Sequence, residues 1–295
     1  MHPRYWFLWL GLALLFVIVY LPHYWRIRCG SILGKLAYYS ASYRRHIVDI
    51  NLSICFPKMS AIDRKKLTKN IFRSAGISII ETGLVWLRSP QAFRNLVEIR
   101  GLEHLEKALE QKEGVILVGM HFSTLDFCGA VLASYCKFDV MYRSNKNPFI
   151  EAIMTRGRTQ NFSNAIERKD IRSVLKSLRR GNAVWYGPDQ DYGRAHSVFV
   201  PFFGHQTATI SATSRLADIS KSPVIIFSHY RLEGDKRYQI CLSKPLKNFP
   251  SGDLAEDASR INKEIEEAIQ RAPEQYWWLH RRFKTTPTKG GIRPY

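Results

Sequence analysis

The chain has 295 residues, of which 45% are hydrophobic and 13% aromatic. This composition excludes an intrinsically disordered protein, and the length allows one large domain or two smaller ones. Lysine and arginine number 44 against 25 acidic residues, and the resulting formal charge of +19 suits an anionic partner, namely nucleic acid, an anionic membrane or an acidic protein.

The N-terminal segment is the first predicted element. Residues 5–21 carry no charge, and their number is at the short end of the roughly 17–25 residues that span a bilayer. Aromatic residues flank both ends, so we expect an N-terminal transmembrane helix and assign 1–25 as a membrane anchor. A cleaved signal peptide is the alternative, although no small-residue cleavage site follows. Only Arg4 precedes the span, whereas Arg26, Arg28 and Lys35 follow it, and this excess of positive charge is expected to place the rest of the chain in the cytoplasm.

The chain after the anchor divides into three parts. Residues 26–100 are expected to form a helical, membrane-proximal segment with helices over 32–51 and 60–88. Residues 101–284 alternate strand and helix patterns, which predicts an α/β domain with a central mixed sheet flanked by helices. The expected strands are 115–120, 138–142, 183–186, 224–229 and 238–242, and the expected helices are 123–136, 148–158, 169–180, 208–220 and 255–270. The polar tail 285–295 contains glycine and proline and is expected to be loose.

The five cysteines are scattered along the chain and include no C-x-x-C pair. An odd, scattered set indicates reduced thiols rather than a disulfide framework or a zinc site. This agrees with a cytoplasmic location for most of the chain.

A histidine and a carboxylate follow the first expected strand of the α/β domain. His121 and Asp126, with four residues between them, come at the turn where strand 115–120 gives way to a helix. At such a turn, side chains and free backbone N–H groups face a crevice at the edge of the sheet. A neutral imidazole held by a carboxylate is a general base that works near pH 7. The alternative is a core histidine beside a helix cap, because Ser123 and Asp126 fit a capping box.

Two later segments carry basic side chains in a pattern that suits anions. Arg143 and Asn145 follow strand 138–142, and Arg156 and Arg158 flank a glycine in the next helix. Guanidinium groups bind phosphates and carboxylates through paired hydrogen bonds. The alternative is a solvated helix end.

The turn after strand 183–186 brings acidic and amide side chains to the same sheet edge. Asp189, Gln190 and Asp191 lie between a Gly-Pro pair and a second glycine. The two carboxylates would bind a divalent metal only with further oxygen ligands, and a purely structural turn is the alternative. Residues 271–284 are predicted to form an aromatic and basic helix, which suits a membrane interface, single-stranded nucleic acid, or a core helix with a basic outer face.

Taken together, these segments resemble the late acyltransferases of lipid A biosynthesis, the Kdo-dependent lauroyl and myristoyl transferases of Gram-negative inner membranes. The resemblance covers the chain to about residue 285 and is greatest to the lauroyl-transferase branch. It depends on six blocks, namely 51–57, 81–83, the block from His121 to Asp126, 155–158, 188–193 and 272–276. One departure is Asp126, where the lipid A branch often has glutamate and the wider glycerolipid acyltransferases have aspartate.

The resemblance implies a glycerolipid-acyltransferase-like fold and an acyl transfer. The donor would be acyl carrier protein, the acceptor a hydroxyacyl chain of Kdo2-lipid IVA, and no metal or cofactor would be needed. His121 would be the base and Asp126 its orienting partner, and Arg158 and Asp189 would be further catalytic residues. The role of Asp189 is open, and one hypothesis is that it holds Arg158 in place. The expected substrate-binding residues are Arg143, Asn145, Arg156, Gln190 and Asp191.

The resemblance also specifies partners and location. The chain would be a single-pass protein of the bacterial inner membrane with its catalytic domain on the cytoplasmic side, in contact with anionic lipids and not with nucleic acid. A basic face would dock the carrier protein; it comprises Arg168, Lys169, Arg172, Lys176, Arg179 and Arg180. A glycerolipid or lysophospholipid acyltransferase is the alternative enzyme, and a membrane-tethered nucleic-acid-binding protein is the alternative from another class.

Overall fold

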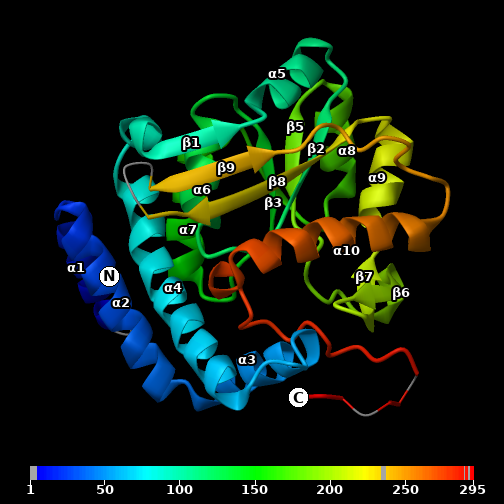
Figure 1. Ribbon diagram of the computed structural model, residues 1–295. Helices are drawn as coiled ribbons and strands as arrows, with labels where there is room; N and C mark the ends of the chain where they lie inside the picture. Colours follow the sequence, from blue (N-terminus) through cyan, green and yellow to red (C-terminus); the bar gives the residue numbers. More distant parts are fainter. Residues whose placement is uncertain (1–4, 234–236, 289, 292) are drawn as a thin grey trace.

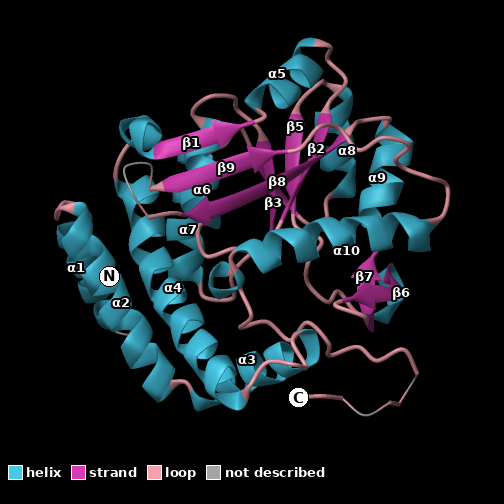
Figure 2. Ribbon diagram, in the orientation of Figure 1, coloured by secondary structure: helices cyan, strands magenta, loops and turns pink. Residues whose placement is uncertain are grey.

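The computed structural model describes residues 5–233, 237–288, 290–291 and 293–295. A seven-stranded sheet lies at the centre, in the order β1-β9-β8-β2-β5-β3-β4, with helices on both faces (Figures 1 and 2). Its strands are β1 (Val97–Arg100), β2 (Val115–Gly119), β3 (Asp139–Tyr142), β4 (Ala165–Glu167), β5 (Ala183–Tyr186), β8 (Val224–Arg231) and β9 (Tyr238–Leu242). All neighbouring pairs are parallel except β8 and β9, so the predicted α/β fold with a mixed sheet is confirmed.

The helices divide the molecule into a sheet domain and an N-terminal helical layer. The layer consists of α1 (Trp6–Val19), α2 (His23–Ser40), α3 (Ser42–Cys55) and α4 (Ala61–Leu87). The sheet is covered by α5 (Leu102–Glu110), α6 (Leu125–Ala133), α7 (Pro148–Asn161), α8 (Ile171–Arg179), α9 (Ala212–Ser220) and α10 (Leu254–Arg271). A separate hairpin pairs β6 (Ser197–Phe202) with β7 (His205–Ile210), and short 3-10 helices include η3 (Arg194–His196) and η4 (Pro273–Gln275).

The central strands are buried on both faces, as their uninterrupted apolar sequences require. Every residue of β2 and of β5 is buried. One core lies between the sheet and helices α5 and α6, and the other lies between the sheet and helices α3, α8, α9 and α10. Helix α4 contributes to both cores, so it joins the N-terminal layer to the sheet.

Helix α4 is the 27-residue support that carries the N-terminal layer. Its N-cap residue is Ser60, whose Oγ accepts a hydrogen bond from the backbone N–H of Asp63. This contact is half of a capping box. Helix α2 packs closely along it through glycines on both helices. A Cβ atom on Gly76 would lie only 2.2 Å from the carbonyl oxygen of Gly30, so a larger residue at this crossing would force the helices apart.

The predicted transmembrane helix over 5–21 is not supported. Among the residues that the structure describes, no helix is both long enough and apolar enough to cross a bilayer. Helix α1 has 14 residues and therefore a length of about 21 Å, against roughly 30 Å for the hydrocarbon core. The chain then turns at Pro22 and begins α2, which contains arginine and lysine side chains.

Four other expectations need correction. The helix predicted over 32–51 is interrupted at Ala41, which separates α2 from α3. The helix predicted over 208–220 begins only at Ala212, because the threonines before it belong to β7. Residues 272–284, here called the C-terminal strap, form η4 and irregular turns instead of a helix. The tail expected to be loose is held at several points, with the hydroxyl of Tyr295 accepting a hydrogen bond from the backbone N–H of Phe283 at 3.0 Å.

Candidate active site

His121 and Asp189 form a hydrogen-bonded pair at the carboxyl edge of the sheet. The first follows β2 and the second follows β5, and these strands are parallel neighbours with Val118 opposite Tyr186. The Nδ1 atom of His121 lies 2.6 Å from Oδ1 of Asp189, and the backbone N–H of His121 donates to Oδ2 at 2.7 Å. A carboxylate can only accept, so Nδ1 carries the proton and Nε2 is left with a free lone pair.

The surroundings of this pair raise the pKa of His121 and lower that of Asp189. Burial alone would lower the pKa of His121, but the charge and hydrogen bond of Asp189, together with the charge of Asp126, raise it above its ordinary value. Burial alone would raise the pKa of Asp189, but its contacts with His121 and the charge of Arg282 lower it. The Asp189 side chain is 1% exposed and the His121 side chain 27% exposed. No described residue hydrogen-bonds to Nε2, so this atom is available to take a proton from a bound hydroxyl group.

Asp126 does not contact the imidazole, contrary to the expectation that it orients the ring. It lies in the first turn of α6, and its Oδ2 accepts a hydrogen bond from the Thr82 hydroxyl of α4 at 3.0 Å. The alternative of a capping box is also wrong, because the N-cap residue is Thr124 and no side chain caps this helix. Asp126 therefore acts on His121 through its charge.

The C-terminal strap fixes the turn that carries His121. The backbone N–H of Ser123 donates to the carbonyl of Gln275 at 2.7 Å, and that of Trp277 donates to the carbonyl of His121 at 2.8 Å. The hydroxyl of Tyr276 donates to the carbonyl of Asp189 at 3.2 Å. The strap therefore holds both members of the pair, a contact between residues more than 80 positions apart that no local pattern could predict.

A buried ionic network holds the same turn from the side of α4. The guanidinium of Arg231 binds the carboxylate of Glu81 through two nitrogen atoms, at 2.7 and 2.5 Å, and a third nitrogen donates to the Ser74 hydroxyl at 3.0 Å. The Ser74 hydroxyl lies 2.7 Å from that of Ser123, two residues after His121. Glu81 belongs to one of the sequence blocks noted above, but its partner Arg231 lies 150 residues away.

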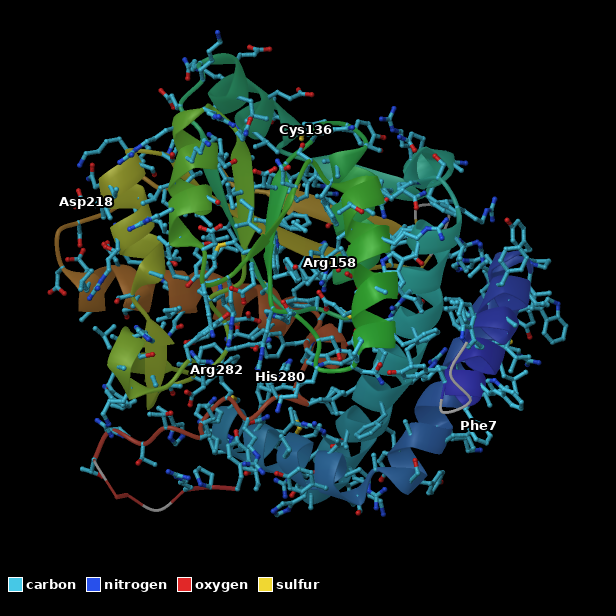
Figure 3. The ribbon with its side chains drawn as sticks, turned by 180° about the vertical axis from the view of Figure 1, so that it is seen from behind. Phe7, Cys136, Arg158, Asp218, His280 and Arg282 are labelled. Carbon is cyan, nitrogen blue, oxygen red and sulfur yellow. The ribbon has the colours of Figure 1, made fainter. Side chains whose placement is uncertain are left out.

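Arg158 lies on α7 with its guanidinium 5.0 Å above the Tyr142 ring. Its Nη1 atom is buried and has no hydrogen-bond partner among the described residues. The hypothesis that Asp189 holds Arg158 is not supported, since Asp189 pairs with His121. Figure 3 labels Arg158, His280 and Arg282; the last two lie below the strands in this view, near the end of the strap.

A basic pocket of about 540 Å³ opens beside this pair. Three of the predicted substrate-binding residues line it, namely Arg143, Gln190 and Asp191. Sequence reasoning did not identify six of the others as binding residues: Tyr43, Arg44, Tyr192, His280, Arg281 and Lys284. The seventh, Arg168, was predicted to dock the carrier protein. These residues come from α3, the segment after β4, the turn after β5 and the strap, so only the tertiary structure brings them together.

The remaining predicted residues lie elsewhere or have structural partners. Arg156 and Asn145 are exposed and do not line the pocket; the side-chain oxygen of Asn145 accepts from the backbone N–H of Asn147 at 2.9 Å. Asp191 accepts hydrogen bonds from the backbone and hydroxyl of Thr285, both at 2.8 Å, and so anchors the C-terminal tail. Within the described part of the chain, no three acidic, histidine or cysteine side chains are grouped as metal ligands would be.

The α/β sheet carries a histidine–aspartate pair at its carboxyl edge, an arrangement that enzymes of several classes use for proton transfer. Comparison with known proteins identifies the class. Residues 1–285 match the model of the bacterial lipid A biosynthesis acyltransferases, and the chain belongs to this family. The chain is therefore an acyltransferase.

Individual relatives are similar to this chain over nearly the whole length of both sequences. The lipid A biosynthesis lauroyltransferase of Escherichia coli (strain K12) is 40% identical over 97% of this chain and 94% of its own length. The palmitoleoyltransferase of the same organism is 37% identical over the same shares. Its myristoyltransferase is 32% identical over 100% of this chain and 91% of its own length. The predicted family is confirmed.

Proposed function

We propose that this acyltransferase moves a lauroyl-like chain from the thioester of acyl carrier protein to a hydroxyacyl chain of a Kdo2-lipid IVA-type glycolipid. The observation that carries the proposal is the His121–Asp189 pair, in which Nε2 has no hydrogen-bond partner among the described residues and the His121 side chain is partly exposed near a basic pocket. The choice of a lauroyl-like chain rests on the 40% identity with a protein named as a lauroyltransferase.

In the proposed reaction, Nε2 of His121 removes the proton of the acceptor hydroxyl as the oxygen attacks the thioester carbonyl. Asp189 stabilises the imidazolium that forms, and this imidazolium then gives its proton to the departing thiolate. The new ester bond replaces the thioester bond, so protons and electrons balance. The position of Asp126 supports a secondary role, in which its charge favours the imidazolium from across the turn.

The tetrahedral intermediate needs hydrogen-bond donors at its oxygen. Arg158 suits this role because its Nη1 atom is a buried donor with no described partner. The backbone N–H groups at the start of α6 are a second source of donors, since that helix begins directly after the His121 turn.

Polar lining residues of the pocket support binding of the acceptor's phosphates and sugar carboxylates. Arg143 and Gln190 supply donors, and Asp191 holds the start of the C-terminal tail through Thr285. Arg156 and Asn145 lack such support, because they lie outside the pocket.

Association with the inner membrane is proposed through the surface of α1 and α2 rather than through a spanning helix. Large apolar side chains are exposed there, including Phe7, Leu10, Leu14, Trp25 and Leu36. Exposed aromatic and aliphatic groups beside arginine and lysine favour the interface of an anionic membrane, with the sheet domain on the cytoplasmic side. The basic residues of α8, among them Arg172, Lys176 and Arg179, are exposed and are proposed to dock the acidic carrier.

The decisive experiment combines purified protein, lauroyl carrier protein and Kdo2-lipid IVA, with mass spectrometry of the glycolipid. We expect one added acyl group with the wild type and none with His121→Ala, while His196→Ala, an exposed histidine outside the pocket, keeps full activity. An unchanged glycolipid with the wild type would reject the function. Normal turnover by His121→Ala would reject the role of this base. A lysophospholipid acceptor in a parallel reaction tests the glycerolipid alternative.

A further inference from the structure

His280 lies between the His121–Asp189 pair and the basic pocket, and the reaction proposed above does not use it. Its ring centroid is 6.0 Å from that of His121, at an interplanar angle of 73°, and its side chain lines the pocket. Its backbone is fixed, because the Asn51 side-chain amide donates to the His280 carbonyl at 2.8 Å. The ring is thus held at the point where the pocket meets the proposed base.

The pocket around His280 has an excess of positive charge. Its cations are Arg44, Arg143, Arg168, Arg281 and Lys284, and its carboxylate is Asp191. Asp191 already accepts three hydrogen bonds from Gly193 and Thr285, and the nearest lining cation, Lys284, is 3.9 Å from it. An anion with several acceptor oxygens would bind here through several cations at once.

Three of these cations contact neutral groups, so these contacts do not neutralise their charge. Arg44 donates to the carbonyl of Leu279 at 3.0 Å, Arg281 lies 5.2 Å above the Tyr43 ring, and Arg168 lies 5.9 Å from the Tyr192 ring. Neutral partners orient a guanidinium without cancelling its charge. Such an arrangement is preorganised for an anionic ligand.

We propose that this pocket is a phosphate-binding subsite and that His280 is its pH-dependent ligand, which takes up a proton when the anion binds. Binding of an anion in this pocket does not depend on the proposed function. Only the identity of the molecule that carries the phosphate rests on it. It is either a phosphate of the glycolipid acceptor or the phosphodiester of the carrier protein's prosthetic group.

The electrostatic surroundings of His280 explain the expected proton uptake. Burial is the largest cause that lowers the pKa of His280, the charges of His121, Arg44 and Lys284 lower it as well, and Asp189 acts in the opposite direction, so that the pKa falls to about 4. His280 is therefore neutral near pH 7 in the free protein. A bound anion favours the imidazolium, so it raises this pKa, and affinity for the anion increases as the pH falls through the raised value.

The test is a titration of histidine Cε1–H signals by NMR in the full chain. Sulfate is the probe, because its charge stays constant from about pH 3 to pH 8, a range that includes the titration of His280 and of ordinary imidazoles. The signal that is lost in His280→Gln identifies His280 among the nine histidines. We expect its pKa to rise by at least about one unit in sulfate, but not in chloride at matched ionic strength. His196→Gln is the matched control and should leave the sulfate effect intact.

A second variant keeps His280 in place and removes one pocket cation. Lys284→Gln is expected to weaken the sulfate effect on the His280 signal, because the anion loses one of its partners. An identical titration of His280 in sulfate and in chloride would overturn the proposal. Since no turnover is measured, this result is independent of the acyl transfer itself.

Kinetics of His280→Gln then distinguish the two sources of phosphate. An increase of about tenfold in KM for the glycolipid alone assigns the subsite to the acceptor, and the same increase for the carrier thioester alone assigns it to the donor. Both results support a substrate phosphate site. Unchanged KM values for both substrates would overturn its assignment as a substrate subsite.

Discussion

Two turns leave the carboxyl edge of the sheet side by side, and they differ in how they supply a carboxylate to the same histidine. The turn after β2 carries His121 and Asp126 close together in sequence, yet Asp126 binds Thr82 of α4. The turn after β5 supplies Asp189, which is 68 residues from His121 and binds the ring and the backbone of that residue. Proximity along the chain therefore does not determine which carboxylate binds this imidazole; the pairing of parallel strands does.

Asp189→Asn should have the larger effect of the two carboxylate substitutions. An amide cannot stabilise the imidazolium and permits the wrong tautomer, so we expect kcat to fall by about 10²- to 10⁴-fold. The pKa of His121 should also fall, since Asp189 raises it in the wild type. The acid limb of the profile of kcat/KM against pH, where His121 must lose its proton, should move to lower pH.

The matched control for this variant is Asp218→Asn. This carboxylate lies on α9, pairs with Lys221, and stands at the left edge of the molecule in Figure 3, away from His280. It should leave both kcat and the pH profile unchanged. An Asp189→Asn enzyme with a wild-type acid limb would show that His121 does not depend on this carboxylate.

Asp126→Asn should have a smaller effect of the same sign. Asp126 raises the pKa of His121 through its charge and without a hydrogen bond, so we expect about a tenfold loss in kcat and a smaller shift of the acid limb. The same pH profiles measure both variants. A greater loss for Asp126→Asn than for Asp189→Asn would reverse the comparison and restore Asp126 as the orienting residue.

The difference between these turns also shows what could be predicted from the sequence. Strands 183–186 and 238–242 were predicted with the observed bounds, because short segments with aromatic and β-branched residues between turn signals have few alternatives. The strap was predicted as a helix, but Pro273 and backbone bonds to the His121 turn favour an irregular path. The resemblance identified Asp189 as important, but its partner depends on strand register, which no local pattern contains.

A third prediction addresses how the turn after β2 is held. Ser123→Ala removes the hydrogen bond to Ser74 and so separates this turn from the Glu81–Arg231 network. Loss of one buried hydrogen bond costs about 1–2 kcal/mol, and we expect kcat to fall severalfold with little change in KM. Ser78→Ala is the matched control, because its hydroxyl binds only the carbonyl of Ala75 within α4. Equal kinetics for both serine variants would show that the network does not position His121.

The smallest expected effect concerns the turn after β5. Tyr276→Phe removes the hydrogen bond from the tyrosine hydroxyl to the Asp189 carbonyl, which at 3.2 Å is longer than the 2.6 Å contact between Asp189 and His121. The ring still packs against Phe122 and Trp278, so folding should be preserved and kcat should fall by about twofold to fivefold. Because Asp189 has two further bonds to His121, the carboxylate stays in place and the acid limb of the pH profile should not move. A shifted acid limb in Tyr276→Phe would mean that the strap, and not the strand register alone, sets the contact between Asp189 and the base.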